Sequence, residues 1–209
     1  MIRISASLLA ANYLVLLDEI ASVLPLVDSF HLDVMDGHFV PNLGLGCDLI
    51  KSLPVGMTKE VHLMVTNPEE VIEDLKDVAV TRYYVHPSTI GDWPAFVQMC
   101  RLRGSSIGVV LNPDQNVQVL DAYMVSSDAI LVMGVQPGFS GQQFLPQTTE
   151  RVAHLRQAYP ELEIVVDGGI NADSAAKVIA AGANGLVLSS YLFGSSDRVQ
   201  AIKTIRAQS

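Results

Sequence analysis

Short apolar runs alternate with longer amphipathic segments along all 209 residues. The short runs have the length and residue types of buried β-strands, and the longer segments repeat apolar residues at helical spacing. Eight strands are predicted, at residues 2–7, 28–35, 59–65, 81–86, 106–111, 128–133, 162–166 and 185–188. Eight helices are predicted between and after them, at residues 12–24, 47–53, 68–77, 92–103, 116–124, 147–158, 172–181 and 197–208.

The alternation of strands and helices predicts the fold class. Strands as apolar as these are typical of parallel sheets that are covered on both faces. Eight strand–helix units favour a closed (β/α)8 TIM barrel over an open doubly wound sheet, which usually has fewer strands. No Pro-, Gly- or Ser-rich linker divides the chain, so we expect residues 1–209 to form a single-domain α/β barrel.

Composition and charge exclude several classes of partner. Hydrophobic residues make up 49% of the chain and charged residues 17%, and the formal net charge is −9. A surface of this sign repels phosphate backbones and anionic lipid headgroups, so neither a nucleic acid nor a membrane is expected as a partner. No apolar run approaches the ~20 residues that span a bilayer. Cys47 and Cys100 fit no disulfide or zinc-finger framework, and we expect free thiols in a cytoplasmic protein.

Polar side chains occur at the carboxyl ends of three predicted strands. His31 and Asp33 alternate with apolar residues in the second strand, His62 occupies the same face of the third, and Asp167 ends the seventh. In a barrel the active site forms at this end, and side chains two residues apart share a face. Taken alone, His31 fits a core position and Asp167 fits a turn. Their joint placement predicts that the four side chains converge.

Two imidazoles and two carboxylates are suitable ligands for one divalent ion. Zn²⁺ is the expected metal, with Fe²⁺, Mn²⁺ and Co²⁺ as alternatives. Such an ion would offset the cost of burying the carboxylates. Two further histidines, His38 and His86, follow strands at the same end, where either substrate contact or plain surface exposure is expected. His154 falls in a predicted helix and is expected to be solvated.

Segments that contain glycine or serine follow the last three predicted strands. These loops contain "PGFSG" at 137–141, "DGG" at 167–169 and "SSYLF" at 189–193. Loops in these places commonly bind a phosphate through backbone N–H groups. Next to a metal site, they point to a sugar phosphate or a similar anion.

Four segments resemble the signature sequences of one enzyme family. "HLDVMDGHFVPN", "VHLMV", "VMGVQPGFSGQQF" and "VVDGGI" are similar to those of ribulose-phosphate 3-epimerase and its close relative D-allulose-6-phosphate 3-epimerase. The resemblance covers nearly the whole chain. It implies a barrel of the ribulose-phosphate-binding type, and a metal-dependent isomerase of the pentose phosphate pathway that inverts C3 of a ketose phosphate. The expected reaction converts D-ribulose 5-phosphate to D-xylulose 5-phosphate through an enediolate, without an organic cofactor. A homo-oligomer is also expected.

The resemblance assigns roles to individual residues. Asp33 and Asp167 would be the acid–base pair as well as metal ligands, with His31 and His62 completing the coordination. Met35, Met64 and Met133 match methionines that line the family's active site. The residues expected to contact substrate are Ser7, His62, Gly138, Phe139, Ser140, Gly141, Gly168, Gly169, Ser189 and Ser190.

Some positions depart from the family pattern and leave alternatives open. Ser189 stands where glycine is usual, Ser88 where glutamate is frequent, and Gly134 and Gln136 also differ. A hexulose phosphate is an alternative substrate, since "VHPST" and "VVLNP" resemble the hexulose enzyme. A non-catalytic sugar-phosphate-binding protein is a second alternative. Decarboxylases and aldolases on similar barrels rely on a lysine, and no lysine here ends a predicted strand.

Overall fold

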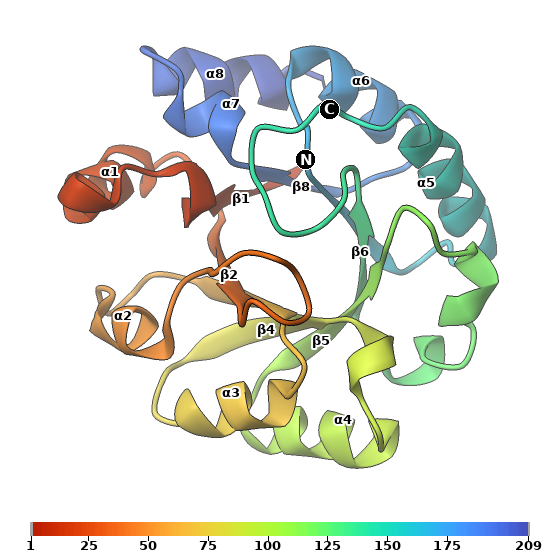
Figure 1. Cartoon of the computed structure of the whole chain (residues 1–209). Helices are drawn as coiled ribbons and strands as arrows, with labels where there is room; N and C mark the ends of the chain where they lie inside the picture. The colour runs from red at the N-terminus through yellow and green to blue at the C-terminus, as the bar shows by residue number, and fades with distance from the viewer. Residues whose placement is uncertain (1, 209) are drawn as a thin grey trace.

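The computed structural model describes residues 2–208 and shows a closed barrel of parallel strands in chain order from β1 to β8 (Figure 1). All eight predicted strands are confirmed, each boundary within two residues of its predicted place. The strands are β1 (Arg3–Ser7), β2 (Ser29–Met35), β3 (Lys59–Met64), β4 (Val80–Val85), β5 (Ser106–Leu111), β6 (Ala129–Met133), β7 (Glu163–Asp167) and β8 (Gly185–Leu188).

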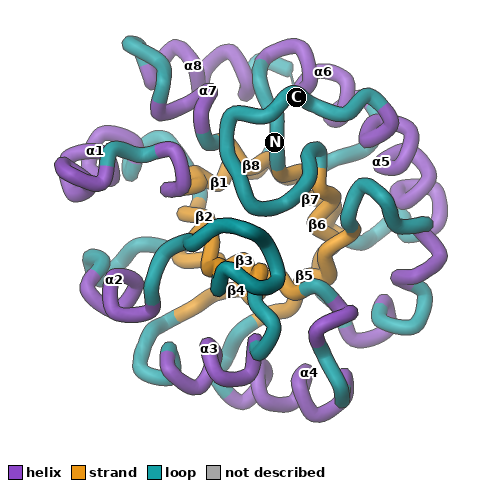
Figure 2. Tube along the Cα trace, in the orientation of Figure 1, coloured by secondary structure: helices purple, strands orange, loops and turns teal. Residues whose placement is uncertain are grey.

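The helices form an outer ring around the strands, as Figure 2 shows. The α-helices are α1 (Leu16–Val23), α2 (Cys47–Ser52), α3 (Pro68–Asp74), α4 (Trp93–Leu102), α5 (Gln147–Ala158), α6 (Ala172–Ala180), α7 (Ser190–Phe193) and α8 (Arg198–Arg206). All of them except α7 correspond to predicted helices, so seven of the eight predicted helices are confirmed. Within residues 2–208, no helix combines the length and apolar character that crossing a membrane requires. Cys47 and Cys100 are free thiols, as expected.

One predicted helix is wrong, and one helix was not predicted. Residues 116–124 form a short 3-10 turn at Val117–Leu120 and another begins at Met124. Only Leu120 is buried in these two turns, while Val119 and Val125 are exposed, so no continuous apolar face supports an α-helix there. The extra element is α7, a single turn directly after β8.

The alternation of side chains along the strands creates two separate cores. Phe30, Leu32 and Val34 of β2 point outward into the large core between the strands and the helices, as predicted. The barrel interior has its own cluster, which includes Tyr84, Leu131 and Met133. Polar side chains that share the inward face are therefore surrounded by packed strands on all sides.

Charged side chains close the amino-terminal end of the barrel. Arg3 Nε lies 2.6 Å from Glu163 Oε1, and Arg82 lies 2.7 Å from Glu163 Oε2. Glu60, which is only 1% exposed, pairs with Arg3 and accepts a hydrogen bond from the Ser29 hydroxyl at 3.0 Å. These ion pairs form the floor of the barrel, so any opening to solvent lies at the opposite end.

The loops after β2 and β6 extend over the ring of strands in the view of Figure 1. They are joined by a hydrogen bond of 2.6 Å from the Asn42 side-chain amide to the Gly138 carbonyl oxygen. The loop after β2 also folds back on its own strand, because the Leu45 N–H donates to the Asp33 carbonyl oxygen at 2.8 Å. The carboxyl end of the barrel is thus partly covered by two connected loops.

Candidate metal centre and pocket

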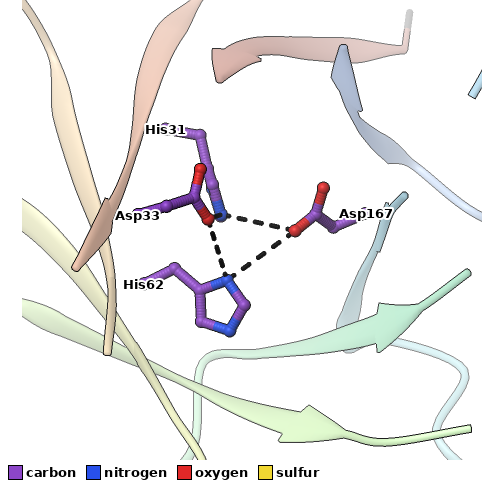
Figure 3. A group of neighbouring side chains, drawn as sticks. All are labelled: His31, Asp33, His62 and Asp167. Carbon is purple, nitrogen blue, oxygen red and sulfur yellow. Dashed lines mark ion pairs between the residues drawn. The ribbon is translucent and has the colours of Figure 1, made fainter. Parts of the chain in front are cut away.

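The four candidate ligands converge at the carboxyl end of the barrel interior (Figure 3). His31 and Asp33 belong to β2, His62 to β3 and Asp167 to β7. Asp33 and His62 are register partners on adjacent strands, which places their side chains next to each other. The side chains of His31 and His62 are fully buried, Asp33 is 4% exposed, and Asp167 is 13% exposed.

The spacing of the ligand atoms fits one small cation. His31 Nε2 lies 3.5 Å from Asp33 Oδ1 and 3.6 Å from Asp167 Oδ2, and His62 Nδ1 lies 3.3 and 3.7 Å from the same two oxygens. All four atoms lie within 4.8 Å of one another. Ligands at about 2.0–2.2 Å from a tetrahedral ion are separated by about 3.3–3.6 Å. The group therefore has the dimensions of a divalent metal site.

The hydrogen bonding of the imidazoles supports the same interpretation. His31 Nε2 and His62 Nδ1 are buried, and neither has a hydrogen-bonding partner among residues 2–208. Buried polar atoms are normally satisfied, so two that point into the same gap require a reason. A bound cation would occupy both lone pairs. The donor set and these two nitrogens therefore fit a metal.

The electrostatics of the group are those of tightly coupled acids and bases. Burial alone would lower the pKa of His31, but Asp33 and Asp167 raise this pKa to about 9. Burial would raise the pKa of Asp33, yet the two imidazoles hold it well below its usual range. Burial raises the pKa of Asp167. The site thus concentrates negative charge that either protons or a cation must balance.

Two neighbours contact these ligands from outside the group. The Ser7 hydroxyl donates to Asp33 Oδ2 at 2.8 Å, which leaves Asp33 Oδ1 facing the imidazoles. His86 Nε2 lies 3.0 Å from His62 Nε2. The expectation that His86 contacts substrate or lies on the surface is wrong, since this residue is 1% exposed. Sequence reasoning missed its place because the burial of His86 depends on contacts with β3 and with the loop after β2.

A pocket lies above the candidate ligands, and Asp33 and Asp167 form part of its wall. Most of the residues expected to contact substrate line it, whereas His62, although adjacent, is too deeply buried to do so. The lining includes Ser7, Met35, Met64, Met133, Gly138, Phe139, Ser140, Gly141, Gly168, Gly169, Ser189 and Ser190. The Ser189 hydroxyl donates a long hydrogen bond of 3.4 Å to the Ser7 carbonyl oxygen.

Three other polar residues, Asp36, His38 and His154, lie outside the pocket. Asp36 begins a turn, as its Oδ1 accepts from the N–H groups of His38 and Phe39, and Gly37 has a φ of 74°. Asp36 Oδ2 accepts hydrogen bonds from the backbone N–H and the hydroxyl of Thr66. These bonds connect the loop after β2 to the loop after β3. His38 is exposed, and His154, on α5, is exposed as expected.

Comparison with known proteins identifies closely related sequences. The profile of the ribulose-phosphate 3 epimerase family matches residues 3–193. The chain is 37% identical to ribulose-phosphate 3-epimerase of Bacillus subtilis (strain 168), over 99% of both chains. It is 35% identical to the cytoplasmic isoform of ribulose-phosphate 3-epimerase from Oryza sativa subsp. japonica, over 98% of this chain and 92% of that protein.

Solved structures with the same architecture are more distant in sequence. KGPDC from Streptococcus mutans superposes with a TM-score of 0.75 at 11% identity, covering 98% of this chain and 95% of that chain. The 3-hexulose-6-phosphate synthase of Salmonella typhimurium also gives 0.75, at 12% identity, covering 99% and 97%. At this level of identity the similarity shows the TIM-barrel fold alone.

Proposed function

The chain belongs to the ribulose-phosphate 3-epimerase family, and from that premise we propose that it is a metal-dependent isomerase that interconverts D-ribulose 5-phosphate and D-xylulose 5-phosphate. The observation that carries this proposal is the meeting of two carboxylates and two imidazoles in one buried cluster, with both carboxylates in the wall of one pocket. Inversion at a carbon next to a ketone requires a base on one face of that carbon and an acid on the other.

Asp33 and Asp167 are suited to be this pair. They come from strands that do not pair with each other, and Figure 3 shows them on two sides of one gap. One carboxylate removes the proton from C3, and the other delivers a proton to the opposite face. The acid therefore starts protonated and the base deprotonated, and one turnover reverses these two states, so the pair holds one proton before and after the reaction. The two residues exchange roles in the reverse direction. Ser7 would hold Asp33 in place through its hydrogen bond to Oδ2.

The bound ion would be held by His31, Asp33, His62 and Asp167. A divalent cation supplies a Lewis acid that stabilises negative charge on neighbouring oxygen atoms. The mixture of two nitrogen and two oxygen donors favours Zn²⁺, while Fe²⁺, Mn²⁺ and Co²⁺ accept the same ligands.

The rest of the pocket is suited to hold the phosphate end of the sugar. Three loops, after β6, β7 and β8, contribute Gly138, Gly141, Gly168, Gly169 and Ser190 to its lining. Backbone N–H groups and small hydroxyl side chains can approach a phosphate closely and do not need a cationic residue. Holding the phosphate fixes C3 between the carboxylates, which contributes orientation and no bond-making step.

The pocket lining argues against the other reactions that such barrels support. No lysine lines the pocket within the described part of the chain. A Schiff-base aldolase needs a lysine as its nucleophile, and decarboxylases of this type commonly place one beside their aspartates. A binding-only protein has no need for two paired carboxylates, whose burial is costly, beside its ligand.

We also propose a cytoplasmic location and a homo-oligomeric assembly. Two free thiols support a cytoplasmic location, because disulfides are rare there. A homo-oligomer is supported by one run of exposed apolar side chains before and in α1, formed by Tyr13, Leu14, Val15 and Leu17. Light scattering of the purified protein would measure the assembly directly.

The experiment that tests the proposal compares two substrates. Purified, Zn²⁺-loaded protein is incubated with D-ribulose 5-phosphate and, separately, with D-allulose 6-phosphate, and kcat/KM is measured for each. The proposal predicts the higher value for the pentulose phosphate. A higher value for the hexulose phosphate would reassign the substrate, and no turnover of either would reject the epimerase assignment.

A further inference from the structure

His86 packs against the buried side of the candidate metal centre. It follows β4 directly and is 1% exposed. Its Nε2 lies 3.0 Å from Nε2 of His62, and the two rings are stacked, with centroids 5.2 Å apart and an interplanar angle of 22°. The ring of Phe39, in the loop after β2, also contacts His86, at a centroid separation of 4.6 Å. His86 is thus enclosed between a ligand and a loop.

The short contact between the two imidazoles restricts where their protons can be. Two N–H groups facing each other at 3.0 Å would repel, so only one of the two nitrogens carries a proton. His62 Nδ1 faces Asp33 Oδ1 at 3.3 Å and Asp167 Oδ2 at 3.7 Å, and it can bind a cation only through its lone pair. The proton of His62 must then be on Nε2. This N–H donates a hydrogen bond to His86 Nε2, which accepts it through its lone pair.

A packing role alone does not explain an imidazole at this position. His86 Nδ1 is buried and has no hydrogen-bonding partner among residues 2–208. An unpartnered buried polar atom is unfavourable, and an apolar side chain of similar size would avoid it. Within that range the contact from Nε2 to His62 is the one hydrogen-bonding contact of the His86 ring, so it accounts for a histidine at this position.

We propose that His86 is a positioning residue that keeps His62 protonated at Nε2 and aims His62 Nδ1 at the bound cation. The inference rests on the proposed metal site. Partners of this kind orient metal-binding histidines, and their loss typically costs about 10–100-fold in metal affinity or activity.

Two substitutions separate positioning from packing. His86→Phe keeps a flat ring of similar size against Phe39 but removes the acceptor. His86→Gln places an amide oxygen near the position of Nε2 and keeps the acceptor. For both variants and the wild type, the dissociation constant for Zn²⁺ is measured by competition with a chromophoric chelator on metal-stripped protein, and the melting temperature is measured without metal.

The expected result is an about 10–100-fold weaker Zn²⁺ affinity for His86→Phe, with a metal-free melting temperature close to wild type, and recovery of most of the affinity in His86→Gln. Equal Zn²⁺ affinity in all three proteins would overturn the inference and leave the proposed function standing. Equal loss in both variants would also overturn it, because packing would then explain the effect. Failure of the wild type to bind Zn²⁺ or another divalent ion would reject the metal site itself.

Discussion

Asp33 and Asp167 are chemically alike but differently placed, and the proposed reaction needs both. Asp33→Asn and Asp167→Asn each remove one proton-transfer group and one charged ligand while preserving the shape of the side chain. We expect a folded barrel with epimerase activity reduced at least about 1,000-fold, on the scale of lost general acid–base catalysis. Circular dichroism would verify the fold. Turnover near the wild-type rate in either variant would exclude the two-carboxylate scheme.

Asp36, in the loop after β2, is expected to make the stability of the protein depend on pH. Burial would raise its pKa, but hydrogen bonds from the backbone N–H groups of Thr66, Phe39 and His38 lower that pKa well below the usual value. A carboxylate with a lowered folded-state pKa stabilises the protein above its unfolded-state pKa of about 4, and this contribution is lost as the pH falls below that value.

The test compares wild type with Asp36→Asn in urea unfolding. Wild type should be the more stable at pH 7, and the difference in unfolding free energy should shrink as the pH decreases below about 4. Asp48→Asn is the control, because the Asp48 side chain is 100% exposed. A difference that stays constant over this pH range would contradict the role given to the Asp36 charge.

The position of a side chain could be predicted where the alternation along a strand determines it. It could not be predicted where only tertiary contacts determine it. The alternation in β2 and β3 was sufficient to place His31, Asp33 and His62 on the inward face, and the structure confirms it. The hydrogen bond from Ser7 to Asp33 joins two different strands, which no local pattern specifies. The burial of His86 depends on Phe39 lying over it, again a contact across loops.

At the scale of elements, Gly44 allows the loop after β2 to close on Asp33. A Cβ at Gly44 would lie 2.3 Å from the Asp33 carbonyl oxygen and 2.8 Å from the Met35 nitrogen. Gly44→Ala must therefore displace either the loop or the end of β2. We expect a loss of about 1–3 kcal/mol in unfolding free energy, typical of overpacking. Activity should fall by up to about 100-fold, since small displacements of catalytic groups have effects of that size.

Gly91→Ala provides the matched control for that substitution. Apart from Gly91 itself and its two chain neighbours, no atom of the described residues lies within 4 Å of a Cβ built at Gly91. This variant should keep the activity and stability of wild type, as measured by kcat/KM and urea unfolding. If Gly44→Ala behaved like Gly91→Ala, the loop after β2 would have no part in positioning Asp33.

The strands were easier to predict than the helices because a buried parallel strand is marked by its own composition. A helix in a barrel needs an apolar face to pack on the strands. Residues 116–124 have the mixture of apolar and polar residues that predicts a helix, but their apolar side chains do not form one buried face. The turn α7 has only four residues, too few to show a periodic pattern.

At the scale of the whole molecule, the charged floor of the barrel should affect stability and leave catalysis intact. Glu60→Gln removes the charge that faces Arg3 in a nearly solvent-free position. Breaking a buried ion pair by removing one partner costs about 3–5 kcal/mol, and the partial exposure of Arg3 favours the lower figure. We expect a loss of about 3 kcal/mol in urea unfolding, with kcat/KM near wild type.

Lys76→Gln supplies the comparison for Glu60→Gln. Lys76 and Glu73 form an exposed pair on the surface, with side-chain exposures of 58% and 59%. Its loss should change the unfolding free energy by less than about 1 kcal/mol. A Glu60→Gln protein that was as stable as Lys76→Gln, or that lost its activity while folded, would contradict the separation between floor and site.

The closed barrel itself was predictable because eight similar strand–helix units leave few other arrangements. The connection between the loops after β2 and β6 was not, since Asn42 and Gly138 are 96 residues apart and meet only when the barrel closes. The binding pocket therefore depends on the complete ring of strands.

The most direct test of the two-carboxylate metal site follows hydrogen exchange at C3. Zn²⁺-loaded protein and D-ribulose 5-phosphate are incubated in D₂O and observed by proton NMR, beside a metal-stripped sample. The account predicts that D-xylulose 5-phosphate appears with deuterium at C3, and that removing the metal greatly slows both product formation and exchange. Product that keeps its original C3 hydrogen, or exchange at full rate without metal, would contradict it.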